Sequence, residues 1–179
     1  MNFRVLIIVF ASLFLLPGCL IVSKISYRIS LKEDLSGSAV VTFFDIRSDA
    51  VGNKEFDEDK KNLFDYIYKS DDFIQSLKLE GKFVQKRDLK IETGKLIGSA
   101  VYEFNDVEKI EGIRKDGKYL YLTLQSDDEV LSTNGEIVGQ NEFKRIIWTQ
   151  GVKELSFDIA SGQSQQRTKD LKPFLNKTQ

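Results

Sequence analysis

The feature that most constrains this chain is an N-terminal apolar segment that ends at its only cysteine. Arg4 is the sole charged residue before the run from Val5 to Leu16, and Pro17 and Gly18 follow that run directly before Cys19. A positive charge, an apolar run of this length and a small residue at its end are typical of a secretory signal. We therefore expect residues 1–18 to be removed, so that the fold is built from the remaining 161 residues.

The motif Leu16-Pro17-Gly18-Cys19 resembles the lipobox of bacterial lipoproteins, in which a branched apolar residue, a tolerant position and a small residue precede the cysteine. Proline is a less usual occupant of the second position. The resemblance implies cleavage between Gly18 and Cys19, lipidation of Cys19, and a lipid anchor that holds the protein at a membrane. Leu20 is not the aspartate that retains enteric lipoproteins in the inner membrane, which favours the outer membrane of the bacterial envelope.

Two other interpretations of this segment exist. One is a membrane-spanning helix, but such a helix needs roughly 20 apolar residues, and Pro17-Gly18 interrupts the stretch from Val5 to Val22. The other is an ordinary secretory signal followed by an unrelated cysteine. The position of the sole cysteine at the processing site favours the lipoprotein.

Missing residue types exclude several kinds of chemistry. The chain has no histidine, which removes the commonest proton shuttle and metal ligand. Once Cys19 is acylated no thiol remains for catalysis, a disulfide or a metal site. The mature chain has 25 basic and 27 acidic residues, so its charge does not indicate a nucleic-acid partner. We expect a protein that is not an enzyme and that needs no cofactor or metal.

The first part of the mature chain predicts a hairpin. Apolar and polar residues alternate from Ile25 to Leu31, turn-forming residues follow from Lys32 to Gly37, and the segment from Ala39 to Ile46 is β-branched and aromatic. Residues 19–24 are then a short tether to the membrane.

Apolar residues next recur at helical spacing, which predicts helices over about residues 58–69 and 71–79, ended by Gly81. The acidic run Asp57-Glu58-Asp59 would lie in the first turn, where carboxylates complement the helix dipole. Ser70-Asp71-Asp72 is a second helix start signal.

The second half returns to strands, with one helical turn expected between Asn105 and Gly112. Asp116-Gly117 and Asn134-Gly135 are hairpin signals. The expected strands are 83–92, 96–104, 119–125, 143–150 and 154–160. The sequence thus predicts one α+β domain over residues 25–161, a mostly antiparallel sheet of about six to eight strands with two short helices on one face. Residues 162–179 are predicted to be a polar tail.

Three acidic clusters are the only concentrated ionisable groups: Asp57-Glu58-Asp59, Asp71-Asp72 and Asp127-Asp128-Glu129. Paired carboxylates can hydrolyse glycosides or bind calcium, but helix starts and a loop explain these clusters more simply. Two aromatic features are also candidates for a site. The stripe of Phe64, Tyr66 and Tyr68 is either core or the lining of a cavity, and Trp148 is either a sheet residue or a platform for a sugar or lipid.

Several short features of residues 25–157 resemble LppM-like lipoproteins. They are Asp34-Leu35-Ser36-Gly37 at the first hairpin turn, the strand from Gly94 to Phe104 followed by Asn105 to Ile110, and Asn134-Gly135 ahead of the strand with Trp148. The resemblance implies an envelope protein with an α+β domain and lipid contact, and it transfers no catalytic residue. Members often have a C-terminal membrane segment, whereas Gly162 to Gln179 is polar.

These observations predict an envelope lipoprotein that binds a lipid, a glycan or a protein partner at the membrane surface. A first alternative is an assembly subunit that would expose a contiguous apolar patch, whereas a ligand carrier would have an internal cavity. A second alternative is a carboxylate-dependent hydrolase, in which acids from different clusters, Asp71 or Asp127 among them, would meet in one cleft.

Overall fold

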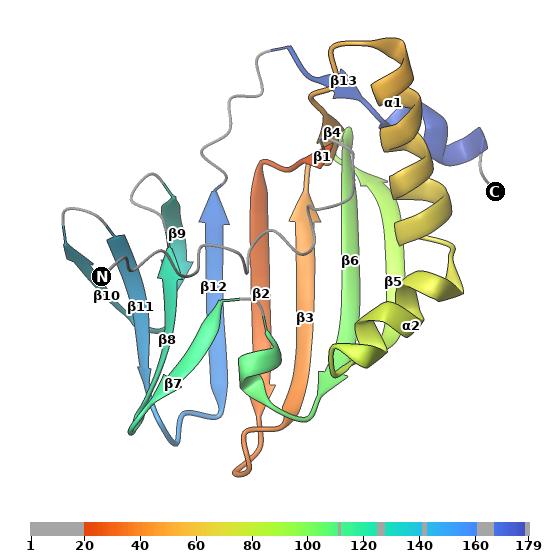
Figure 1. Ribbon diagram of the computed structural model, residues 1–179. Helices are drawn as coiled ribbons and strands as arrows, with labels where there is room; N and C mark the ends of the chain where they lie inside the picture. Colours follow the sequence, from red (N-terminus) through yellow and green to blue (C-terminus); the bar gives the residue numbers. More distant parts are fainter. Residues whose placement is uncertain (1–19, 111, 125–127, 141–142, 161–166, 178–179) are drawn as a thin grey trace, which may run out of the picture.

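The chain folds into an α+β structure with three antiparallel sheets. The computed structural model describes residues 20–110, 112–124, 128–140, 143–160 and 167–177 (Figure 1). The largest sheet has six strands in the order β5-β6-β3-β2-β12-β9. Its strands are β5 (Lys82–Glu92), β6 (Lys95–Phe104), β3 (Gly37–Phe44), β2 (Lys24–Leu31), β12 (Glu154–Ala160) and β9 (Glu129–Thr133). The predicted fold class is confirmed.

Two smaller sheets complete the structure. The four-stranded sheet has the order β10-β11-β8-β7, and the three-stranded sheet has the order β1-β4-β13. Their strands are β10 (Glu136–Gln140), β11 (Phe143–Thr149), β8 (Tyr119–Leu124), β7 (Ile113–Asp116), β1 (Leu20–Ile21), β4 (Arg47–Ser48) and β13 (Lys169–Asp170).

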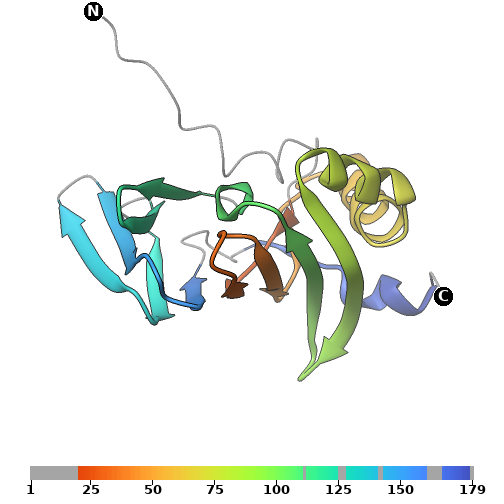
Figure 2. The same cartoon turned by 90° about the horizontal axis from the view of Figure 1, so that it is seen from below.

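The helices lie on one face of the six-stranded sheet, over its β5 and β6 side (Figures 1 and 2). The helical segments are α1 (Asn53–Lys60), the π-helix η1 (Lys61–Ile67), α2 (Asp71–Leu79), and the short 3-10 helices η2 (Val107–Lys109) and η3 (Lys172–Lys177). Ser70 caps α2, because its hydroxyl accepts a hydrogen bond from the Asp72 backbone N–H at 3.0 Å. Gly81 follows α2 in the left-handed conformation that favours glycine.

The first helix begins earlier than the sequence predicts. It starts at Asn53 and continues through η1 to Ile67, whereas the apolar spacing places its start at residue 58. Phe56 is the only apolar residue of α1, so periodicity could not reveal this segment. The acidic run therefore lies beyond the first turn, and the predicted interaction with the helix dipole is wrong. Asp59 instead is fully buried, and its Oδ2 accepts a 2.5 Å hydrogen bond from the Ser48 hydroxyl.

The apolar faces of β2 and β3 explain where the core lies. Ile25, Tyr27 and Ile29 of β2 are buried, whereas the intervening residues face the opposite side of the sheet. The four-stranded sheet packs on the same face at β12, where Trp148 of β11 contacts Phe157 at a ring-centroid distance of 5.9 Å. Within the large sheet, Phe157 stacks on Tyr27 of β2 at 4.9 Å. The helices and the second sheet thus share one face of the large sheet.

The two larger sheets are joined at Asn134-Gly135, where the sequence predicts a hairpin. That prediction is wrong, because β9 pairs with β12 and β10 pairs with β11. Asn134 Oδ1 accepts hydrogen bonds from Trp148 Nε1 and the Ser156 backbone N–H, both at 2.8 Å, and its Nδ2 donates to the Glu154 carbonyl at 2.8 Å. A Cβ atom at Gly135 would lie 2.7 Å from Trp148 Nε1, so this position needs glycine.

Both ends of the described chain belong to the fold. Residues 20–24 are not a tether, since β1 pairs with β4, and Ile21 and Val22 are buried. The C-terminal segment also differs from the predicted polar tail. Strand β13 pairs with β4, and Leu171 and Leu175 are buried in the core. Every described element, and every buried residue of the described core, lies after residue 19.

Replacing Asn134 with alanine should lower the free energy of unfolding by about 2 kcal/mol, because the buried Trp148 indole N–H loses its acceptor. Urea unfolding followed by Trp148 fluorescence measures this. Ser132→Ala on neighbouring β9 is the control and should change stability by less than about 0.5 kcal/mol. Equal stability of the two variants would contradict the role of Asn134 as the joint between the sheets.

A second polar contact links β2 and β12 on the open face of the large sheet. Asp158 Oδ1 accepts hydrogen bonds from the Ser26 hydroxyl at 2.7 Å and Arg28 Nη1 at 2.8 Å. Burial acts to raise the pKa of Asp158, but the hydrogen bonds from Arg28 and Ser26 and the charges of Arg28 and Lys24 hold it below its ordinary value of 3.8. The folded state therefore favours the ionised carboxylate.

The ionised Asp158 carboxylate should therefore make the free energy of unfolding decrease at low pH. Its contribution is complete above its unfolded-state pKa and is lost as pH falls through its lower folded-state pKa. Unfolding by urea at about pH 5 and about pH 3 should show a smaller acid-induced loss for Asp158→Asn than for the unaltered protein. The exposed Glu154→Gln on the same strand should leave the loss unchanged, and an identical loss in Asp158→Asn would refute the assignment.

Candidate functional site

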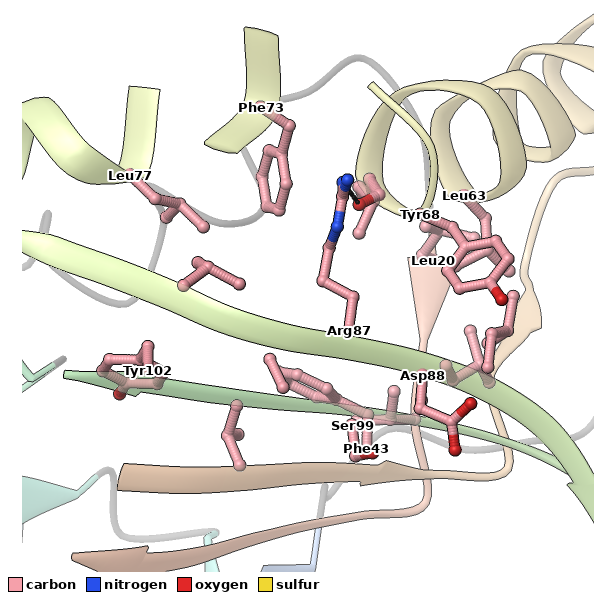
Figure 3. A pocket seen from close by; sticks show the side chains of 18 of the residues that line it. Leu20, Phe43, Leu63, Tyr68, Phe73, Leu77, Arg87, Asp88, Ser99 and Tyr102 are labelled. Atoms are coloured by element: carbon pink, nitrogen blue, oxygen red, sulfur yellow. Dashed lines mark hydrogen bonds between the residues drawn. The ribbon is translucent and has the colours of Figure 1, made fainter. Parts of the chain in front are cut away.

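The main candidate site is an apolar cavity of about 150 Å³ between the helices and the inner face of the six-stranded sheet. Figure 3 shows Phe73 and Leu77 of α2 above the cavity, with Leu63 and Tyr68 from η1 and its C-terminal end beside them. The floor is formed by residues of β2, β3, β5 and β6, namely Tyr27, Val41, Phe43, Val84, Leu89, Gly98, Ala100 and Tyr102. Most of the lining is apolar, so the cavity is suited to a hydrocarbon group.

Small residues on β6 explain why the cavity exists. Gly98 and Ala100 face the helices, each paired with Leu89 or Arg87 of β5. A Cβ atom at Gly98 would lie 2.9 Å from Ile46 Cδ1, so this strand position is already closely packed by its neighbour. The short side chain of Ala100, on the same face of β6, therefore leaves more of the open space between this strand and the helices.

A π-helical segment covers one side of the cavity. In η1, the Tyr68 backbone N–H donates to the Leu63 carbonyl at 2.9 Å, five residues earlier. Such wide turns are rare and are frequent at functional sites. Leu63 and Ile67 of this segment line the cavity.

Arg87 connects the sheet to the end of this helix. Its side chain rises from β5 between Phe73 and Tyr68 (Figure 3). Nη1 donates to the carbonyls of Ile67 at 2.8 Å and Ser70 at 3.0 Å. Ile67 is the last residue of η1 and Ser70 is the N-cap of α2, so the guanidinium bridges the end of one helical segment and the start of the next. Arg87 therefore fixes the chain between η1 and α2 above the cavity.

The other charged groups of the lining are directed elsewhere. Lys82 Nζ forms an ion pair with Glu80 at 3.1 Å. Asp88 and Ser99 lie opposite each other in the sheet and point away from the helices (Figure 3). In the described part of the chain, Arg87 has no carboxylate within ion-pair distance. The cavity thus combines an apolar wall with a single uncompensated cation.

The first described residue of the chain lies at this site. Leu20, the first described residue, lines the cavity. Cys19 precedes it by one peptide bond, which places consecutive Cα atoms about 3.8 Å apart. Gly18 and Cys19, the predicted cleavage and lipidation residues, themselves lie outside the described residues.

A second concave feature lies on the outer face of the four-stranded sheet. This open groove of about 270 Å³ is lined by Asp116, Tyr119, Tyr121, Glu136, Arg145 and Ile147. The Arg145 guanidinium lies 4.9 Å from the Tyr121 ring centre and 4.8 Å from that of Phe143, and its Nε donates to the Thr123 hydroxyl. Charged side chains (Asp116, Glu136 and Arg145) make up half of its lining, so its chemistry differs from that of the cavity.

The structure does not bring the three acidic clusters into one cleft. Asp57 pairs with Lys60 at 2.6 Å, Asp59 is buried against Ser48, and Asp71-Asp72 begins α2. The third cluster precedes and enters β9, at the opposite edge of the large sheet from β5, on which α2 packs. Asp127 lies outside the described residues. Over the described ranges, no three acidic or cysteine side chains are grouped as metal ligands.

The aromatic candidates have separate roles. Phe64 is buried in the core, Tyr66 packs edge-on against Phe73 at 5.4 Å, and Tyr68 lines the cavity. Trp148 is only 3% exposed, with its indole N–H bonded to Asn134, so it serves as a core residue of the second sheet.

Sequence reasoning missed the residues that define the cavity. Gly98 and Ala100 are small residues at two successive inward positions of a strand that was correctly predicted, and this pair was the available signal. Arg87 gave a weaker signal, as a cation at an inward position in the middle of β5.

Comparison of the chain with protein-family models, curated proteins and solved structures gave no match. Among the described helices, none has both the length and the apolar character needed to cross a membrane.

Proposed function

We propose that this protein is a lipid-anchored bacterial envelope protein whose domain binds the hydrocarbon chain of a lipid in the cavity under η1 and α2. The observation that supports this proposal most strongly is that the apolar cavity lies beside Leu20. A site suited to hydrocarbon is thus next to the residue that follows the expected lipid anchor. Ligand pockets are largely preformed, concave and apolar. We assign no catalytic role to the site, whose lining residues offer no nucleophile paired with a base.

The size of the cavity favours a single chain. Sites for drug-sized molecules have volumes of roughly 300–1,000 Å³, whereas this cavity has about 150 Å³. It accommodates part of one acyl chain and leaves the rest of the molecule outside. Each buried methylene contributes about 0.8 kcal/mol, so a few of them provide useful affinity.

The distribution of exposed apolar residues supports ligand binding over a scaffold role. Large exposed apolar side chains are spread over several elements and include Val40 on β3, Val51 before α1, Leu79 on α2 and Leu131 on β9. An assembly surface would gather such residues into one patch.

Filling the cavity should abolish binding. Ala100→Leu adds a branched side chain to the floor, and we expect binding of the neutral apolar dye phenylnaphthylamine, followed by fluorescence, to weaken by about tenfold or more. Val101→Leu, on the same strand but on the open face, should bind as the unaltered protein does. The assay uses the mature chain with Cys19→Ser. Equal binding by all three proteins would contradict the proposal.

A further inference from the structure

Arg87 is a half-buried cation in a cavity that is otherwise almost entirely apolar. Both of its hydrogen bonds to Ile67 and Ser70 come from Nη1. Nε and Nη2 have no hydrogen-bond or ion-pair partner among the described residues. A charge in such surroundings is costly unless an opposite charge or further acceptors accompany it.

A purely structural role would not require this arrangement. Neutral donors or water can satisfy helix-end carbonyls, whereas a guanidinium with a free edge presents two parallel N–H groups that match the two oxygens of a carboxylate. The bonds from Nη1 restrict the rotation of the guanidinium, so the free edge is already oriented before a ligand arrives.

We propose that the ligand of this cavity is a single-chain anionic amphiphile, a fatty acid, with its carboxylate on Nε and Nη2 of Arg87 and its hydrocarbon chain among Phe73, Leu77, Val84 and Ala100. This inference rests on the proposed function and adds the charge and the number of chains of the ligand. The small cavity has room for one hydrocarbon chain, and the Arg87 cation pairs with one acidic head group. Lys82 does not compete as the binding cation, because Glu80 already neutralises it.

The site also predicts the effect of the bound head group on the helices. A carboxylate bound to Arg87 would lie next to the junction of η1 and α2. The same guanidinium already donates hydrogen bonds to the Ile67 and Ser70 carbonyls at this junction. Binding should therefore increase the protection of the amides around Ser70 against hydrogen exchange.

The test compares decanoate with decanol, which differ in charge but share the same chain. Both are titrated at neutral pH against the phenylnaphthylamine complex of the mature chain with Cys19→Ser. Decanoate should displace the dye at a concentration about tenfold or more below that needed for decanol, the difference that a charge-assisted hydrogen bond supports. This comparison needs no change at Arg87, so it does not depend on whether a variant folds.

Arg87→Met should remove the preference for decanoate while decanol still displaces the dye. Lys86→Met, an exposed cation on the opposite face of the same strand, should keep the preference. If decanol binds as tightly as decanoate, or if Arg87→Met weakens both equally, the anionic-ligand inference is overturned and the proposed function stands. If neither compound nor the dye binds, both are overturned.

Discussion

The inner face of the six-stranded sheet is the constraint on which the rest of the structure depends. Alternation along β2 and β3 directs their apolar side chains to one side, and burying that surface is the main source of stability. No single element covers it. The four-stranded sheet packs against it at β12, where Trp148 contacts Phe157, and the helices pack over its β5 and β6 side (Figures 1 and 2).

The two coverings differ in how completely they pack. Between the two larger sheets, the Trp148 and Phe157 rings fill the space, and Asn134 accepts a hydrogen bond from the Trp148 indole N–H. This contact is therefore closely packed. Under the helices, the short side chain of Ala100 leaves space on the floor of the cavity, whereas Ile46 already packs against Gly98. A cavity costs stability in proportion to its volume, so its retention in an otherwise dense core points to a use. Arg87 adds a second cost at the same place, which a bound anion would offset.

Local patterns in the sequence predicted local structure well. Contacts between residues far apart in the sequence were harder to predict. Alternation and turn residues located the β2-β3 hairpin, and Ser70-Asp71-Asp72 located the start of α2. Asn134-Gly135 was misinterpreted because a turn signal does not reveal which strand the chain joins next. The start of α1 was missed because its exposed face is almost entirely charged. The cavity depends on residues of seven elements, so only the strand positions of Gly98 and Ala100 could have suggested it.

The central claim is that this protein carries a single-chain acidic lipid between its helices and its sheet. Native mass spectrometry of the full-length protein, purified from bacterial membranes in mild detergent, tests it most directly. The account predicts a noncovalent adduct of one fatty acid per protein in addition to the covalent anchor, and this adduct should be absent from Ala100→Leu. A protein that carries only its anchor, or one whose adduct persists in Ala100→Leu, would contradict it.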